Sequence, residues 1–257
     1  RWAVTKAIPV PKVIDEEHLE TAAYPLFAKP ARGFGSIGAR VCRTVDEARQ
    51  AVAERGDLVF EEYLSGTEYS ADGYVNREGA CTVCVVRVRD KVVGGEAYRS
   101  RTVSEPEVFQ VARQTIETLA TEGHRGPVNV QIIRGQTLGV IDVNPRLGSA
   151  SLLSNQATGG RLFEGLLREA TGETVWGDPA DYRVGLQLWR FLGEVFFQDG
   201  QVLGVYPPVT RMGANKRSLD STKSFPDMDS HPARPHFDNT GRLSQGKTSK
   251  LFDANES

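Results

Sequence analysis

Four polar side chains around one predicted turn have the types and spacing of a metal and phosphate site. Residues 128–146 contain two largely apolar runs joined by Gly-Gln-Thr, which predicts two strands and a tight turn. Asp142, Asn144 and Arg146 occupy alternate positions, and a strand places such side chains on one face. Gln131 on the partner strand could join them. Carboxylate and amide oxygens bind a hard cation and a guanidinium binds phosphate, so the group predicts a Mg-nucleotide site. An edge strand that ends in a polar loop would give the same pattern.

A lysine followed by a glycine-rich segment marks a predicted hairpin near the N-terminus. Lys29 lies near the end of a short apolar run, and residues 33–38 contain three glycines. The next five residues predict a returning strand, so we expect a hairpin with a flexible glycine-rich tip. Thr44 and Glu47 have the spacing of a capping box, which predicts a helix from there to about residue 54.

The composition excludes several classes of protein. A chain of 257 residues suffices for one large or two small domains with real cores. Its formal net charge of -2 gives no basic excess for nucleic acid, and no acidic block forms a solvating tail. No apolar run has membrane length and no signal peptide opens the chain, so we expect neither nucleic acid nor membrane as a partner. Because the first residue is Arg1 rather than Met, we expect the chain to begin inside a longer one.

The three cysteines predict buried structural thiols rather than a disulfide framework or a metal site. Cys81 and Cys84 form a C-x-x-C pattern within a strand-like run. Positions three apart on a strand point to opposite faces, so the two sulfurs do not easily share a metal. A reducing cytoplasm is the expected location.

The remaining periodicity predicts a β-rich middle followed by mixed elements and a polar tail. We expect strands at 58–64, 68–75, 80–88, 92–102, 183–190 and 193–197, turns at 76–79 and 89–91, and helices at 106–122 and 162–170, with a loop before the last helix. Residues 212–257 lack a periodic apolar face and predict a mobile tail or linker. Residues 241–248 match the P-loop pattern, but the required strand before it and helix after it are missing, so we interpret the match as chance.

Taken in order, these elements resemble the ATP-grasp superfamily, and most of all its carbamoyl-phosphate-synthase-like branch of ATP-dependent carboxylate ligases. The resemblance covers about residues 2–200. Its most specific part is Asp142 to Arg146, which is similar to the family's acidic-x-Asn-Pro-Arg motif. The resemblance implies an α+β fold of two lobes with the nucleotide between them. We expect a smaller lobe at 1–65 with the glycine-rich hairpin, a larger lobe at 66–205 with the metal site, and a polar tail or linker at 206–257.

The resemblance implies a nucleotide-binding role for several residues of the smaller lobe and its border. Lys29 would contact the ATP phosphates, as one of two catalytic residues, and the hairpin would close over them as a lid. Glu61 or Glu62 would accept a hydrogen bond from the adenine amino group, and Glu68 would bind the ribose. The full set of expected ATP contacts is Lys29, Gly33, Gly35, Ser36, Gly38, Glu61, Glu62, Tyr63, Leu64 and Glu68.

In the larger lobe, the resemblance implies that Gln131, Asp142 and Asn144 hold Mg²⁺ between the β- and γ-phosphates. Arg146, the second catalytic residue, would steady the transferred phosphoryl group. Arg99 and Arg101 alternate on one predicted strand and could anchor a substrate carboxylate, although solvated arginines show the same pattern.

The implied activity is an ATP- and Mg²⁺-dependent ligation of a carboxylate to an amine through an acyl phosphate, with ADP as product. Two features depart from the family pattern: Asp142 replaces the usual glutamate, and no earlier phosphate-binding lysine or nucleotide-fold domain precedes the region. A missing N-terminal domain, a partner subunit that completes the site, or a loss of activity would each explain the second. The alternatives to ligation are a non-catalytic nucleotide- or metabolite-binding module, a bicarbonate-activating enzyme of carbamoyl-phosphate or carboxylase type, and an interaction protein whose tail docks a partner.

Overall fold

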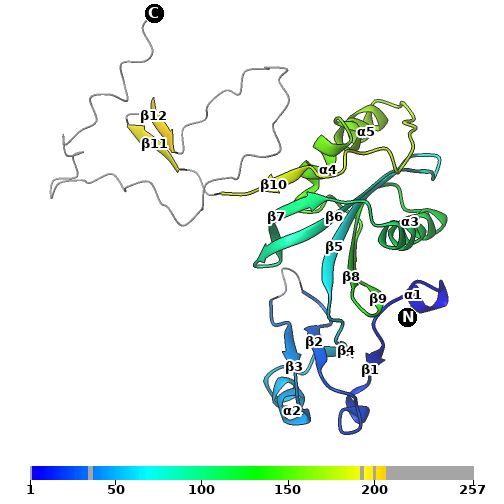
Figure 1. The fold of residues 1–257 in the computed structure, drawn as a ribbon, viewed down its shortest axis with the longest axis vertical. Helices are drawn as coiled ribbons and strands as arrows, with labels where there is room; N and C mark the ends of the chain where they lie inside the picture. The colour runs from blue at the N-terminus through cyan, green and yellow to red at the C-terminus, as the bar shows by residue number, and fades with distance from the viewer. Residues whose placement is uncertain (1, 34–36, 192–193, 199–200, 207–257) are drawn as a thin grey trace, which may run out of the picture. The chain divides into compact units, whose positions relative to one another are not determined.

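The computed structural model describes residues 2–33, 37–191, 194–198 and 201–206. The chain divides into two compact units, Arg1–Gly193 and Glu194–Ser257. The first unit contains two antiparallel sheets with their covering helices (Figure 1). The second contains the antiparallel pair β11 (Glu194–Gln198) and β12 (Gln201–Tyr206). The predicted tail at 212–257 and the P-loop-like match lie outside the described residues.

The smaller sheet has four strands in the order β1-β4-β2-β3. Its members are β1 (Val13–Ile14), β2 (Leu26–Pro30), β3 (Arg40–Cys42) and β4 (Leu58–Glu62). The predicted pairing around the glycine-rich segment is confirmed, because β2 and β3 are antiparallel partners. Helix α2 (Val45–Glu54) buries Ala48 and Ala51 in this sheet's core. The predicted cap is also confirmed, since Thr44 Oγ1 accepts a hydrogen bond from the amide of Glu47 at 3.2 Å.

The larger sheet has six strands in the order β10-β7-β6-β5-β8-β9. These are β5 (Thr67–Val75), β6 (Cys81–Val93), β7 (Glu96–Thr102), β8 (Gly126–Arg134), β9 (Leu138–Asn144) and β10 (Gln187–Trp189). Helix α3 (Pro106–Thr121) packs its apolar side on one face, through residues such as Val108 and Ile116. Helices α4 (Ser151–Ala157) and α5 (Arg161–Ala170) cover the other face, where Leu162 packs on Tyr74 and Val85 (Figure 1). Two shorter elements lie near the N-terminus: α1 (Trp2–Thr5) precedes β1, and a 3-10 turn at Glu16–His18 lies between β1 and β2.

Three predictions about these elements are wrong in detail. Strand β6 continues to Val93 instead of turning at 89–91, and the turn lies at Gly94 and Gly95, both with positive φ. Helix α4 occupies the segment expected as a loop. Its seven residues have no clear apolar period, because its buried side chains combine the hydroxyls of Ser151 and Ser154 with Leu153 and Ala157. Strand β10 has three residues rather than eight.

All three cysteines are free; Cys42 and Cys84 are buried, as the sequence predicts, whereas Cys81 is partly buried. Burial raises the pKa of the Cys81 thiol to about 12 and that of Cys84 well above its ordinary value, so both thiols stay protonated at neutral pH. Within the described part of the chain, no helix has both the length and the apolar character needed to cross a membrane.

Candidate nucleotide and metal site

A cavity of about 590 Å³ within the first unit is lined by residues from both sheets. The smaller sheet contributes Phe27, Lys29 and Glu61, and the larger sheet contributes Glu68, Arg89, Gln131 and Asp142. The segment that joins the two sheets, from Glu62 to Gly66, forms a further part of the wall. Volumes of this size are typical of small-molecule and cofactor sites.

Gln131, Asp142 and Asn144 meet at one carboxylate oxygen, as the alternation of the sequence predicts. Gln131 lies directly opposite Asp142 in the pairing of β8 with β9. Asn144 Nδ2 donates to Asp142 Oδ2 at 2.6 Å, and Gln131 Nε2 approaches the same oxygen at 3.4 Å. Turning the Asn144 amide about its terminal bond would bring its oxygen to Asp142, whereas the Gln131 oxygen accepts from Arg89 Nη1 and would have to leave that bond to do the same. Asp142 and Gln131 line the cavity, and a carboxylate with amide oxygens beside it is a donor set that fits Mg²⁺.

Lys29 is held in the cavity by two contacts. Its Nζ lies 2.8 Å from Glu61 Oε2 and donates to the carbonyl oxygen of Ile141 at 3.3 Å. Since Ile141 belongs to β9, this lysine connects the smaller sheet to the strand that carries Asp142. Glu61 is engaged by the lysine, whereas Glu62 is exposed and lines the cavity.

Arg89 is a cavity residue that the sequence analysis did not identify. Its side chain is only 5% exposed, and its Nη1 lies 3.1 Å from Glu68 Oε1 and donates to Gln131 Oε1 at 2.7 Å. Its Nε has no hydrogen-bond partner, and burial lowers the pKa of the guanidinium despite the nearby Glu68. Arg89 therefore connects an expected ribose-binding acid with an expected metal ligand. The available signal was a charged residue at every second position of an otherwise apolar strand, Arg87 and Arg89.

Only some of the other predicted site residues line the cavity. Gly33, Tyr63 and Leu64 line the cavity, whereas Gly38 does not, and Gly35 and Ser36 lie outside the described residues. Arg146 lies beyond the end of β9, so the strand alternation does not extend to it, and its Nη1 donates to the carbonyl oxygen of Leu147 at 3.0 Å.

Arg99 and Arg101 do not line the cavity. Ser100, between them, faces Arg87, so both arginines point to the opposite side of the sheet. Arg99 lies over the ring of Trp189, with its Cζ 5.2 Å from the ring centroid, and Arg101 bonds Asp90 at 3.3 Å. Their assignment to a substrate carboxylate stays a prediction.

Comparison with protein families gives a match to the model of the ATP-grasp domain over residues 2–150. Among characterised proteins, the N-terminal section of the carbamoyl phosphate synthase large chain of Methanopyrus kandleri is 26% identical over 219 residues, which are 74% of this chain and 39% of that protein. The L-propargylglycine–L-glutamate ligase of Streptantibioticus cattleyicolor is 32% identical over 144 residues, or 51% of this chain and 29% of that protein. The chain thus spans well under two thirds of the length of either relative.

Solved structures share the fold. The biotin carboxylase domain of the Hydrogenobacter thermophilus 2-oxoglutarate carboxylase, a complex with MgADP and bicarbonate, superposes with a TM-score of 0.61 at 18% identity, over 72% of this chain and 46% of that one. The L-amino acid ligase of Bacillus licheniformis gives a TM-score of 0.53 at 18% identity, over 71% of this chain and 48% of that one. At these identities, the likeness establishes the α+β fold.

Proposed function

The chain belongs to the ATP-grasp family, and we propose that it binds Mg-ATP in the cavity between its two sheets and ligates a carboxylate to an amine with release of ADP. One observation carries this proposal. Gln131 and Asn144 both approach one carboxylate oxygen of Asp142, and Asp142 lines the cavity together with Lys29. Phosphoryl transfer needs positioned charge rather than covalent help from the protein, and this arrangement provides an anionic metal site facing a cation.

In this proposal the adenosine lies toward the segment that joins the sheets, and the phosphates lie between Lys29 and Asp142. Because Lys29 neutralises Glu61, we assign the contact with the adenine edge to Glu62 and its neighbours rather than to Glu61. Glu68 holds the ribose, with its carboxylate oriented by Arg89. The bound Mg²⁺ would neutralise the charge on the β- and γ-phosphates. Arg146 then stabilises the phosphoryl group as it moves to the substrate carboxylate.

The substrates follow from the same reasoning. A carboxylate oxygen attacks the γ-phosphorus and displaces ADP, which gives an acyl phosphate, and an amine then displaces phosphate to form an amide. One relative is named as a ligase of two amino acids, which supports small amino and carboxylic acids as substrates. The three free thiols of the described residues fit a reducing compartment, and we place the protein in the cytoplasm on that basis. The division into lobes at 1–65 and 66–205 with a polar tail at 206–257 remains part of this proposal.

The experiment is an ADP-release assay with a panel of carboxylic and amino acids, in which hydroxylamine serves as a general amine. An activated acid gives a hydroxamate, and the proposal requires one hydroxamate for each ADP. The matched control is Asp90→Asn, because Asp90 is a partly exposed carboxylate that pairs with Arg101 away from the cavity. Bicarbonate-dependent ADP release without hydroxamate would favour a bicarbonate-activating enzyme. Mg-ATP binding with no ADP release would contradict catalysis and favour a binding module.

A further inference from the structure

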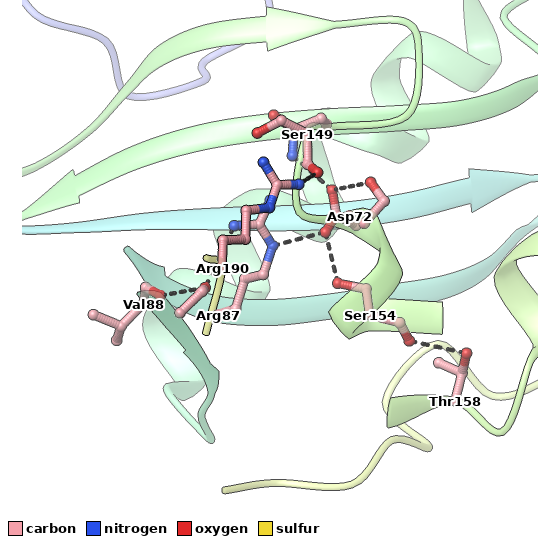
Figure 2. Close-up of polar contacts among 10 residues, drawn as sticks. Asp72, Arg87, Val88, Ser149, Ser154, Thr158 and Arg190 are labelled. Carbon is pink, nitrogen blue, oxygen red and sulfur yellow. Dashed lines mark hydrogen bonds and ion pairs between the residues drawn. The ribbon is translucent and has the colours of Figure 1, made fainter. Parts of the chain in front are cut away.

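Asp72 is the centre of a buried polar cluster, on the sheet face that also carries Glu68 and Gln131. It lies in β5, and its side chain is 2% exposed, as is that of Arg87. Four donors reach its two oxygens: Arg87 Nε at 2.8 Å, Asn129 Nδ2 at 2.7 Å, Ser151 Oγ at 3.0 Å and Ser154 Oγ at 2.6 Å. Figure 2 shows Arg87 and Ser154 approaching Asp72 from different elements.

The polar groups of the cluster are hydrogen-bonded, but burying its charged side chains costs desolvation energy. Burial alone would raise the pKa of Asp72, but the Arg87 charge and the hydrogen bonds hold it below its ordinary value, so the carboxylate stays ionised. An apolar replacement of a buried ion pair is often as stable as the pair, so fold stability alone gives little reason to keep one. The informative feature is what the four donors connect.

The donors attach a single loop to the sheet. Arg87 and Asn129 belong to strands β6 and β8, whereas Ser151 and Ser154 belong to α4, directly after residues 145–150. These six residues contain Arg146 and form the whole connection between β9 and α4. Asp72 therefore fixes the far end of the loop whose near end is Asn144, one of the metal-site residues.

Two further contacts hold the middle of this loop. At Gly148, an added Cβ would lie 2.7 Å from Asn129 Nδ2 and 3.0 Å from Asp72 Oδ1, so the loop packs directly on the cluster. The Arg190 guanidinium donates to the carbonyl oxygen of Ser149 and also bonds Glu96 at 2.9 Å, as Figure 2 shows for the Ser149 contact. By contrast, among the described residues the Arg146 guanidinium forms one hydrogen bond, through Nη1, and its other N–H groups can donate to a ligand.

We propose that Asp72 is a positioning residue: it holds the 145–150 loop against β5, β6 and β8 so that Arg146 keeps one fixed geometry. The inference rests on the proposed function, because it gives Arg146 its phosphoryl-binding role. Asp72 itself lies beneath the loop and does not line the cavity. A phosphoryl-transfer site needs such a frame, since its rate depends on the placement of charges around the transferred group.

The first test measures the loop without any substrate. Ser154→Ala removes the donor with the 2.6 Å bond to Asp72 and leaves the buried ion pair in place. We expect amide hydrogen exchange at residues 146–151 to rise about tenfold in this variant, because one hydrogen bond that holds the loop is lost. The control is Thr115→Val, which removes a buried hydroxyl of α3 that bonds the carbonyl oxygen of Val111 on the other face of the sheet. Unchanged exchange at 146–151 in Ser154→Ala, or an equal rise in Thr115→Val, would overturn the proposal.

The second test asks whether the effect on turnover passes through Arg146. Per folded molecule, Ser154→Ala and Asp72→Asn should lower kcat for ADP formation about 10- to 100-fold, the range seen when supporting residues of a site are lost. The dissociation constant for Mg-ATP should change less than threefold. In an Arg146→Lys background, the same substitutions should lower kcat little further, because the guanidinium group that Asp72 and Ser154 position is no longer present. Equal losses in both backgrounds would mean a general structural role. If Asp72→Asn does not fold, the Ser154→Ala comparison carries the test.

The two tests separate the failure of this inference from the failure of the proposed function. If the wild type releases no ADP with any acid, the proposed function fails, and the exchange measurement alone decides whether Asp72 orders the loop. If the wild type is active and exchange rises while kcat does not change, the loop is ordered by Asp72 but its order has no catalytic consequence, and the positioning role is refuted.

Discussion

Replacing Asp142 by asparagine should remove most of the stabilisation that Mg-ATP gives to this protein. The change keeps the shape of the side chain and removes its charge. Without ligand it should shift the free energy of unfolding by about 0.5 kcal/mol or less, because Asp142 is exposed and an asparagine oxygen can still accept from Asn144. The effect on ligand binding is expected to be far larger, since the carboxylate is the one anionic group among the three proposed metal ligands.

The magnitude follows from ligand linkage. Mg-ATP at about 100 times its dissociation constant stabilises the folded state by about 2.7 kcal/mol. For a unit of this size that raises the Tm by about 5–10 °C. Loss of a residue that only supports a metal ligand already costs about 10- to 100-fold in metal affinity, so loss of a ligand should cost about 100-fold or more. At the same ligand concentration, the variant would then gain about 0.4 kcal/mol, or about 1–2 °C.

Thermal unfolding of both proteins, with ATP and either Mg²⁺ or EDTA, measures this difference directly. Asp90→Asn is the matched control, because it also removes one exposed carboxylate from the larger sheet. Its Mg-ATP shift should equal that of the wild type. A full shift of about 5–10 °C in Asp142→Asn would refute the metal assignment. No shift in any of the proteins would show that the cavity does not bind the nucleotide.

Three more outcomes are expected. Lys29→Ala should weaken Mg-ATP binding by about tenfold in calorimetry, since one charge-assisted contact is lost, whereas Lys12→Ala, at an exposed lysine outside the cavity, should leave affinity unchanged. Gly66→Ala should lower the free energy of unfolding, measured in urea, by about 2–4 kcal/mol, because Gly66 has φ +155° and a Cβ there would lie 2.3 Å from a backbone carbonyl oxygen. The control is Gly56→Ala, where a Cβ would meet open space; it should change the free energy of unfolding by less than about 1 kcal/mol. The lowered pKa of Asp72 should stabilise the fold above about pH 4, and this contribution should vanish as pH falls through the folded-state pKa, so acid titration of Asp72→Asn should show a shallower loss of stability than the wild type.

The proposed metal-site residues could be grouped from the sequence because their contacts are local. Gln131 and Asp142 are separated by one hairpin, and hairpin pairing with strand alternation is enough to bring them face to face. The same local rules predicted the β2–β3 pair and the cap at Thr44. The ordered motifs also predicted the α+β ATP-grasp fold, which the family match and the structural likenesses confirm.

The sequence signals were weak for two features that were predicted wrongly, the turn at 89–91 and the loop in place of α4. The 89–91 turn was expected because Arg89, Asp90 and Lys91 are all charged, yet Arg89 is buried by pairing with Glu68 and Gln131. The α4 segment gave no clear helical period because two of its four buried side chains are hydroxyls, and these hydroxyls donate to a carboxylate from a distant strand.

Sequence alone therefore determined most of the element types, the hairpin that carries the proposed metal ligands, and the family. Tertiary structure alone decided which face of the larger sheet α4 covers, and with it that Asp72 is buried beneath the loop of Arg146 rather than solvated. It also decided that Lys29 takes Glu61 as its partner and that Arg89 lies in the cavity. The physical reason is the same in each case. The local sequence around a charged strand residue looks the same whether its side chain is solvated or buried. Only the residues that contact it from elsewhere in the fold decide between these two cases.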